Sequence, residues 1–349
     1  AVLGTGITTE LHGKALEAVQ MINEFADYIV ISVDIPSGID ANTGKVLGSA
    51  VVADYTVTFC SPKVGNLLYP GAEYNGDVVV ANISIPEYLL DNSRAKDSEY
   101  KYNLLTRDYV STILPYRPNN SHKGTFGSVL SVAGSFGLTG AAYLSAISAL
   151  KVGAGYSNLA VPKSLVPVFA SMTPEIIYTP LEDKNSGIIT HENVNTVLDN
   201  SNKANCILIG PGIGTETATI DFISDFCIQA SNRGLKCIFD ADALNCISKL
   251  PEINLPLDSI LTPHPKELAR LLKKPVEEIL NDRITNVIEA AQKFNCIVIL
   301  KGARTLIAEP DGTLYINPTG NSALATAGTG DVLSGMIAGF VAQNLSLID

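Results

Sequence analysis

The segment NSALATAGTGDVLSGMIAGF, residues 321–340, places a run of small, turn-forming residues directly before an acid and then begins an apolar helix. A helix start leaves several backbone N–H groups unpaired and carries partial positive charge. Glycines let a ligand approach that backbone, so residues 327–330 predict an anion site. The carboxylate of Asp331 would repel a bound anion unless a reaction takes place between the two groups.

Outward from this segment, residues 104–349 alternate short apolar strands with helical stretches. Strands are predicted within SVLSVAG, YSNLAV, CILIG, KCIFDA, SILTP and CIVILKG, and a helix of small residues within GAAYLSAISALKVGAG. Strands that are apolar throughout, joined by crossovers of helical length, predict a mostly parallel sheet covered by helices on both faces. Ligands of such sheets bind beyond the carboxyl ends of the strands.

The amino-terminal region has the same α/β texture on a smaller scale. A helix is predicted in HGKALEAVQMINEF and strands in YIVISVDIP, ADYTVTF and GDVVVANISIP. Polar residues then take over. We therefore expect a first domain at 1–88, a linker at 89–104 and a second domain at 105–349. The chain begins at Ala1 and stops at Asp349 shortly after a helix, so both ends are expected to be cut.

The composition argues against several classes of protein and partner. The chain has 349 residues, of which 46% are hydrophobic and 17% charged, and this predicts packed domains rather than disorder. A net charge of −11 without a Lys/Arg block argues against nucleic acid or an anionic membrane as a partner, so any phosphate binding must be local. Six scattered cysteines without a CxxC are typical of small buried side chains in a cytoplasmic protein, rather than of disulfides or metal ligands. No signal peptide or apolar run of membrane length is visible.

Six segments of the second region come directly after predicted strands or before predicted helices. They are GSFGLTGAA (134–142), GPGIGT (210–215), DADALN (240–245), TPHPKE (262–267), KGARTL (301–306) and AGTGD (327–331). Each alone is weak evidence, because glycines after strands are ordinary turn residues. Together at one edge of a sheet they predict a ligand site.

Asp331 can accept a proton from a substrate hydroxyl while the amides of residues 327–330 hold the charge of a transferring phosphoryl group. Alternatively it only caps its helix, which is worth about 0.3–1 kcal/mol. Lys301 would pair with nucleotide phosphate or is a solvated lysine at a strand end. Thr305 could bind phosphate or simply continue a strand.

The loop TPHPKE has two prolines around His264, which favours a ligand contact over an ordinary surface histidine. Glu267 could hold Mg²⁺ directly or through water, although an acid in the first turn of a helix is also common for structural reasons. Asp240 and Asp242 could orient the ligand or magnesium-bound water, or just terminate a strand.

These motifs, with HKGTFGSVLSVAGSFGLTGAA and NSALATAGTGDVLSG, resemble the ribokinase-like NAD(P)H-hydrate dehydratases over nearly all of 105–349. The motifs LGTGITTE and VDIPSGIDANTGKVLG resemble the carboxyl half of the NAD(P)H-hydrate epimerase domain, which precedes the dehydratase in bifunctional repair proteins. The resemblance implies an α/β protein in which a partial Rossmann-like epimerase domain is followed by a ribokinase-like domain with a mostly parallel central sheet.

The implied reaction repairs NADH or NADPH that carries water across a ring double bond. ADP or ATP phosphorylates the hydroxyl of the S epimer, with Mg²⁺ neutralising charge, and phosphate then leaves as the ring nitrogen donates electrons. Sugar kinases of the ribokinase fold have Asn where this chain has His264, so the sequence departs from them toward the dehydratases. Fusion of the two domains suggests a prokaryotic protein that uses ADP, and relatives suggest a homo-oligomer.

The resemblance also assigns residues in the second domain. The hydrate would contact Ala141, Gly214, His264 and Asp331. The adenine nucleotide would contact Lys301, Gly302, Ala303, Arg304, Thr305 and Gly330. The anion hole would consist of Ala327, Gly328, Thr329 and Gly330.

In the first domain, the resemblance places substrate phosphates on a loop that contains Gly4, Thr5, Gly6, Ile7, Thr8, Thr9 and Glu10. Asp34 would be the epimerising centre and Ser37 would bind K⁺. Two family elements linked with potassium are not found in the sequence: an asparagine- and glycine-rich loop, and an acid just before Ala1. Epimerase activity is therefore not expected of the chain as printed.

Two other functions fit the same residues. A small-molecule kinase of the vitamin-precursor type would use the same anion hole and acid, but would release a stable phosphorylated alcohol. A non-catalytic nucleotide-binding protein would keep the phosphate contacts without turnover.

Overall fold

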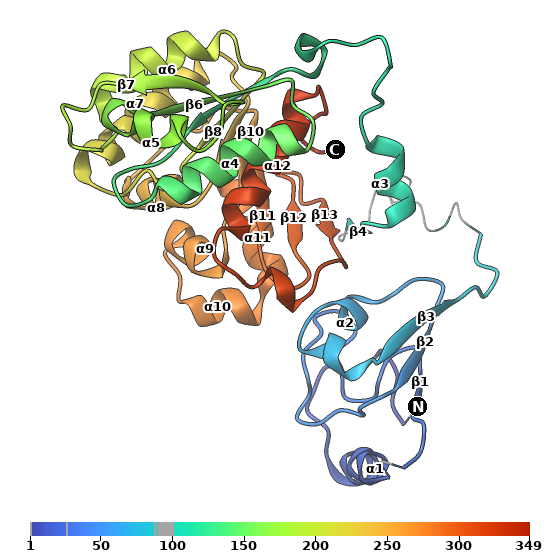
Figure 1. Cartoon of the computed structure of the whole chain (residues 1–349). Coiled ribbons are helices and arrows are strands. Elements are labelled where there is room, and N and C mark those ends of the chain that lie inside the picture. The colour runs from blue at the N-terminus through green and yellow to red at the C-terminus, as the bar shows by residue number, and fades with distance from the viewer. Residues whose placement is uncertain (1, 26, 87–88, 90–100) are drawn as a thin grey trace. The chain divides into compact units, whose positions relative to one another are not determined.

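The structure is a computed structural model that describes residues 2–25, 27–86, 89 and 101–349. The chain divides into two compact units, Ala1–Tyr102 and Asn103–Asp349 (Figure 1). Residues 90–100, most of the predicted linker, lie outside the described residues. The last residues of that predicted linker form a short strand, β4 (Tyr102–Leu104).

The first unit contains a three-stranded parallel sheet in the order β1-β2-β3. Its elements are α1 (Gly13–Glu24), β1 (Ile31–Val33), β2 (Tyr55–Phe59), α2 (Val64–Leu67), the 3₁₀ turn Gly71–Tyr74 and β3 (Asp77–Ala81). Val33 at the end of β1 is in register with Val57 of β2. Asp34 therefore follows β1 at the edge of the sheet where parallel strands present their carboxyl ends.

The second unit is built on a ten-stranded sheet in the order β4-β13-β12-β11-β10-β9-β8-β5-β6-β7. The strands after β4 are β5 (Ser128–Val132), β6 (Tyr156–Pro162), β7 (Ile177–Leu181), β8 (Cys206–Ile209), β9 (Cys237–Phe239), β10 (Ser259–Leu261), β11 (Ile297–Leu300), β12 (Leu306–Ala308) and β13 (Leu314–Ile316). All pairings among β5 to β11 are parallel, whereas β11 pairs with β12, and β12 with β13, in antiparallel fashion. The predicted mostly parallel sheet is confirmed.

The helices of the second unit lie mostly in the connections between parallel strands. They are α3 (Arg107–Ile113), α4 (Thr139–Lys151), α5 (Val166–Ala170), α6 (Val194–Ser201), α7 (Thr217–Ser231), α8 (Asp242–Lys249), α9 (Pro265–Leu272), α10 (Val276–Asn281), α11 (Arg283–Phe294) and α12 (Thr329–Ala342). Among the described residues, no helix is both long and apolar enough to cross a lipid bilayer.

Helices α4 and α12 lie side by side over strands β5 and β8 (Figure 1). They approach closely because their contact is made by small residues. A Cβ atom on Gly335 would lie 2.1 Å from the backbone oxygen of Ser145, so no larger residue fits there without moving a helix. Beneath them, Val129, Leu208 and Ala338 are fully buried in one apolar cluster. This packing fixes the start of α12, and hence Asp331, over the sheet.

All six cysteines are free thiols, and five of them are buried. Burial raises the pKa of the Cys206, Cys246 and Cys296 thiols to about 12, so these side chains are unreactive apolar filler.

Candidate active site

Three adjacent strands of the second unit end in side chains that bind one another. Asp240 follows β9, Thr262 follows β10 and Lys301 follows β11. Oδ1 of Asp240 lies 2.8 Å from Nζ of Lys301 and accepts a hydrogen bond of 2.7 Å from the Thr262 hydroxyl. Asp240 is only 1% exposed, so its charge depends on this cation for compensation. The arrangement holds the Lys301 ammonium at the carboxyl edge of the sheet.

His264 and Glu267 form the capped start of α9 beside that lysine. Nδ1 of His264 accepts from the N–H of Glu267 at 3.2 Å, and Oε2 of Glu267 accepts from the N–H of His264 at 2.8 Å. Oε2 of Glu267 is also 3.8 Å from Nζ of Lys301. Burial raises the pKa of Glu267 to about 7 against the opposing effect of Lys301. Burial and the nearby Lys301 and Arg270 cations lower the pKa of His264, which favours its neutral form.

The start of α12 is open toward this cluster. Gly328 precedes the helix with φ +86°, and a Cβ there would lie 2.6 Å from Cδ1 of Leu144, so the position requires glycine. Among the described residues, the backbone N–H groups of residues 327–331 have no hydrogen-bond acceptor. A Cβ on Gly330 would lie 3.5 Å from Nζ of Lys301. Unpaired amides and an ammonium group therefore face one location.

Asp331 lies in the first turn of α12 within the field of the same charges. Burial raises its pKa to about 6, the Asp240 carboxylate adds to the rise, and Lys301 opposes it. Lys301 was predicted from one segment, and the acid with its predicted anion hole from another, and the structure makes them neighbours. A carboxyl group with a pKa near neutrality can accept and return a proton.

Ala141 and Gly214 come from the connections that follow β5 and β8, on the other side of β9 from Lys301. Gly214 lies in the loop after β8, and its N–H donates to Oδ2 of Asp242 at 3.0 Å. In the same loop, a Cβ on Gly212 would lie 3.1 Å from the Cβ of Ala141, which is in the first turn of α4. The loops after β5, β8 and β9 are therefore contiguous, as expected for one binding edge.

The segment from Lys301 to Thr305 is a tight turn between β11 and β12. Arg283, at the start of α11, donates to the backbone oxygen of Ala303 at 2.8 Å and of Arg304 at 3.0 Å. The Thr305 hydroxyl donates to the oxygen of Gly302 at 3.1 Å and so faces its own turn. The sequence analysis missed Arg283, because an arginine at a helix start gives no sign that it reaches another loop. It is a supporting residue of the predicted nucleotide loop.

Magnesium fits this edge only as a partner of phosphate. Among the described residues, no group of three or more His, Cys, Asp or Glu side chains is arranged to hold a metal ion. Glu267, the predicted ligand, is taken up by His264 through Oε2, and its Oε1 lies 3.4 Å from Nε2 of the same histidine. Mg²⁺ bound to nucleotide needs only one or two protein carboxylates, and the carboxylates at this edge are those of Asp240, Glu267 and Asp331.

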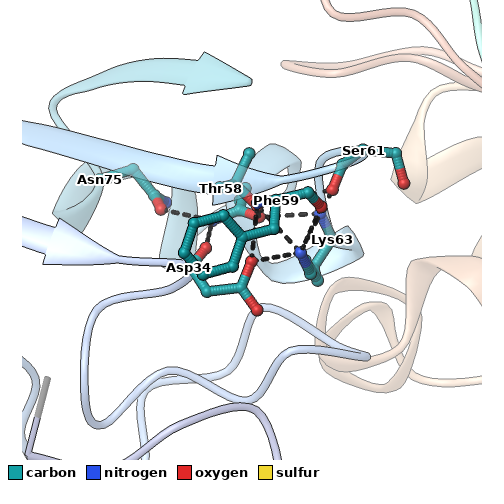
Figure 2. Close-up of polar contacts among 7 residues, drawn as sticks. Asp34, Thr58, Phe59, Ser61, Lys63 and Asn75 are labelled. Atoms are coloured by element: carbon teal, nitrogen blue, oxygen red, sulfur yellow. Dashed lines mark hydrogen bonds and ion pairs between the residues drawn. The ribbon is translucent and has the colours of Figure 1, made fainter. Parts of the chain in front are cut away.

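In the first unit, Asp34 is the centre of a compact polar cluster (Figure 2). Its Oδ1 accepts hydrogen bonds from Nζ of Lys63, from the Thr58 hydroxyl at 3.0 Å and from the N–H of Phe59 at 3.0 Å. Burial acts to raise the pKa of Asp34, but the hydrogen bonds from Lys63, Phe59 and Thr58 outweigh it and hold the pKa below its ordinary value. Lys63 was missed by the sequence analysis.

The predicted phosphate loop of the first unit lies near the loop that follows Asp34. Residues 4–10 form a mostly exposed loop ahead of α1, which begins only at Gly13, so they do not form a helix start. No hydrogen bond among the described residues joins this loop to Asp34. Its position near the Asp34 loop comes from Ser37, which binds the backbone of Leu3.

Potassium does not fit the Ser37 hydroxyl in this arrangement. Ser37 is 3% exposed. Its Oγ accepts from the N–H groups of Val2 at 3.0 Å and Leu3 at 2.9 Å and donates to the oxygen of Leu3 at 2.8 Å. These three bonds use the full capacity of a hydroxyl group.

Solved structures share the architecture of the second unit. One is a crystal structure from Enterococcus faecalis described as a ribokinase-like superfamily protein, 27% identical, with a TM-score of 0.60 over 70% of this chain and 81% of that chain. Another is the ADP/ATP-dependent NAD(P)H-hydrate dehydratase from Bacillus subtilis co-crystallized with ATP/Mg²⁺, 31% identical, with a TM-score of 0.58 over 70% and 84% of the two chains. The fold and its open helix start therefore define a ribokinase-like α/β protein.

Family matches are more specific. Residues 129–349 match the NAD(P)H-hydrate dehydratase family, and residues 1–65 match the family called YjeF-related protein N-terminus. The chain belongs to the NAD(P)H-hydrate dehydratase family, which confirms the resemblance seen in the sequence. The bifunctional NAD(P)H-hydrate repair enzyme of Thermofilum pendens is 43% identical over 97% of this chain, and that of Moorella thermoacetica is 39% identical over 99%. The chain spans 62% and 64% of the length of these two relatives.

Proposed function

We propose that the second unit catalyses the ADP- or ATP-dependent dehydration of the S epimer of hydrated NADH or NADPH. The observation that carries the proposal is the position of Asp331, a carboxyl with a pKa of about 6, beside unpaired amides and the Lys301 ammonium. The names of the relatives and the fit to the Bacillus subtilis dehydratase support the same reaction.

In this reaction Asp331 takes the proton of the ring hydroxyl as the hydroxyl oxygen bonds to the terminal phosphorus of the nucleotide. The bond from that phosphorus to the bridging oxygen breaks at the same time, which releases AMP from ADP or ADP from ATP. The amides of residues 327–330 and the Lys301 ammonium hold the charge of the transferred group. Phosphate then leaves with the electrons of the C–O bond as the ring nitrogen donates its pair, and loss of a proton from the adjacent carbon restores the ring double bond. His264, Ala141 and Gly214 line the side on which the hydrate would lie.

Magnesium, held by Glu267 together with the nucleotide, would neutralise phosphate charge during transfer. Asp240 keeps Lys301 in place and does not occupy the proposed anion site, because it binds the lysine from the buried side.

Recovery of NADH absorbance near 340 nm from the S epimer with ADP, and separately with ATP, tests the proposal. Asp331→Asn should abolish recovery but spare ADP binding, measured by calorimetry. Asp225→Asn, on the exposed face of α7, is the matched control and should behave like the wild type. A stable phosphorylated alcohol without NADH would instead identify a kinase. Nucleotide binding without any product would identify a non-catalytic protein.

We also infer that the first unit is the carboxyl half of an epimerase domain, with Asp34 as the centre that would act on the hydrate. The family match over residues 1–65 and the position of Asp34 after a parallel strand support this. Comparing NADH recovery from the R and S epimers tests it, because only an active first unit allows the R epimer to be recovered faster than it converts spontaneously.

A further inference from the structure

Lys63 is held more tightly than a surface lysine. Its side chain is 24% exposed, and its Nζ lies within hydrogen-bond distance of four oxygens. Besides Oδ1 of Asp34, these are the Thr58 hydroxyl at 3.1 Å and the backbone oxygens of Phe59 at 3.0 Å and Ser61 at 3.3 Å. An ammonium group has three hydrogens to donate, so every donor has a partner and the group has one position (Figure 2).

The two oxygens of Asp34 have different surroundings. Oδ1 accepts from three donors, whereas Oδ2 accepts from none among the described residues. A carboxylate in an ordinary structural ion pair would distribute its donors over both oxygens where it can. Here one oxygen is saturated and the other is left for an incoming hydrogen-bond donor.

The backbone of Asp34 is also in a conformation that is uncommon for a side-chain-bearing residue. Its φ is +69°, directly after β1. Such a conformation persists where the surroundings impose it, and it concentrates at functional sites. A buried polar layer imposes it here: Nδ2 of Asn66 donates to the backbone oxygen of Asp34 at 3.3 Å and to Oδ1 of Asn75 at 2.8 Å. Asn66 and Asn75 are 3% and 0% exposed.

We propose that Lys63 is the positioning residue of the first unit: it fixes Asp34 as a carboxylate whose free Oδ2 accepts a hydrogen bond from the ring hydroxyl of the hydrated dinucleotide. This inference rests on the function proposed for the first unit. It adds a residue that acts through Asp34 rather than on the ligand. Lys63, Thr58 and Phe59 all donate to Oδ1 and together orient Oδ2, and Lys63 is the one of the three that carries a charge.

The test follows the Asp34 carboxyl carbon by NMR in the full chain labelled at aspartate Cγ, with the signal assigned by its loss in Asp34→Asn. Lys63→Met should raise the pKa of Asp34 by about 1–3 units, because a cation in contact is removed. Lys63→Arg should keep it low. Lys45→Met, on an exposed lysine of the same unit, is the matched control and should leave it unchanged. If Lys63→Met fails to fold, Lys63→Gln gives the same measurement.

The second readout is the response of that signal to hydrated NADH. It should shift in the wild type, in Lys63→Arg and in Lys45→Met, and should stay at its ligand-free position in Lys63→Met at the same concentration. An unchanged Asp34 titration in Lys63→Met, or no response of Asp34 to the hydrate in the wild type, overturns the proposal. NADH recovery from the S epimer with ADP, measured on the same samples, reports on the second unit alone. If NADH is not recovered while the Asp34 signal still shifts with hydrated NADH, the result counts against the dehydratase proposal and not against the role of Lys63.

Discussion

The pH dependence of turnover should report the carboxyl group of Asp331. Burial, with Asp240 adding to it, raises the pKa of Asp331 from 3.8 to about 6. A general base must be ionised, so a base with this pKa is about one-tenth active at pH 5, whereas an ordinary aspartate would be more than roughly nine-tenths active there. We therefore expect kcat/KM to fall about tenfold between pH 8 and pH 5.

Removing the charge of the neighbouring Asp240 carboxylate tests this pH dependence. Asp240→Asn removes a negative charge that raises the pKa of Asp331, while the amide oxygen of the asparagine can still accept the hydrogen bond that positions Lys301. The acidic limb of kcat/KM should therefore move to lower pH, by about 0.5–1 unit for one charge at the edge of a protein. Asp225→Asn removes an exposed carboxylate from the same unit and should not move the limb.

Initial rates of NADH formation from the S epimer at 340 nm, between pH 4.5 and pH 8, measure this limb. The uncatalysed loss of the nucleotide at each pH is subtracted. A flat profile between pH 5 and pH 8 would show that Asp331 is not the titrating base. A limb that stays in place in Asp240→Asn would show that the acid titrates independently of the Lys301 cluster.

Three further variants test the framework around the site. Gly335→Ala should destabilise the second unit to denaturant by about 1–3 kcal/mol, because its Cβ would lie 2.1 Å from a backbone oxygen of α4, whereas Gly140→Ala, with open space around it, should not. Glu267→Gln should stabilise the second unit by about 1–3 kcal/mol at pH 8 but not at pH 4. Because the pKa of Glu267 is raised to about 7, the folded state favours the protonated acid. The stability of the wild type that comes from this protonated form is lost as pH rises through 7. Arg283→Met should raise the KM for ADP about tenfold by releasing two backbone oxygens of the nucleotide loop, with the pH profile unchanged.

The sequence predicted those parts of the fold that depend on local pattern. Apolar runs such as CILIG and CIVILKG, each ending in glycine, were enough to predict parallel strands and a ligand edge. The hairpin β12–β13 was missed, although strands β9 and β10, which are equally short, were predicted. The family resemblance, rather than spacing, assigned Ala141 and Gly214.

Lys63 and Arg283 were missed for a different reason. Both are long side chains that act on another loop, at sequence distances of 29 residues for Lys63 to Asp34 and 20 for Arg283 to Ala303. Their partners are set by the way strands are ordered in the sheet, which the sequence of a single chain does not state. His264 is the opposite case, because it was predicted as a ligand contact and the structure adds a second role, the cap of α9. One histidine fulfils both roles only if its exposed edge faces the hydrate.

The pKa values of the two proposed site carboxyls, Asp331 and Asp34, are shifted in opposite directions. Asp34 follows strand β1, and Asp331 lies in the first turn of α12. Each is proposed to meet a hydroxyl of the same hydrated ring. Burial raises the pKa of Asp331 to about 6, nearby carboxylates add to the rise and Lys301 only partly opposes it, so Asp331 can exchange protons near neutrality. Asp34 has Lys63 in contact, so its pKa falls and it stays ionised. A carboxylate that stays ionised throughout the working range orients a hydroxyl well but keeps a proton poorly. It follows that Asp34 by itself would be a weak proton carrier, and that the epimerisation proposed for this kind of domain would need a second group to return the proton.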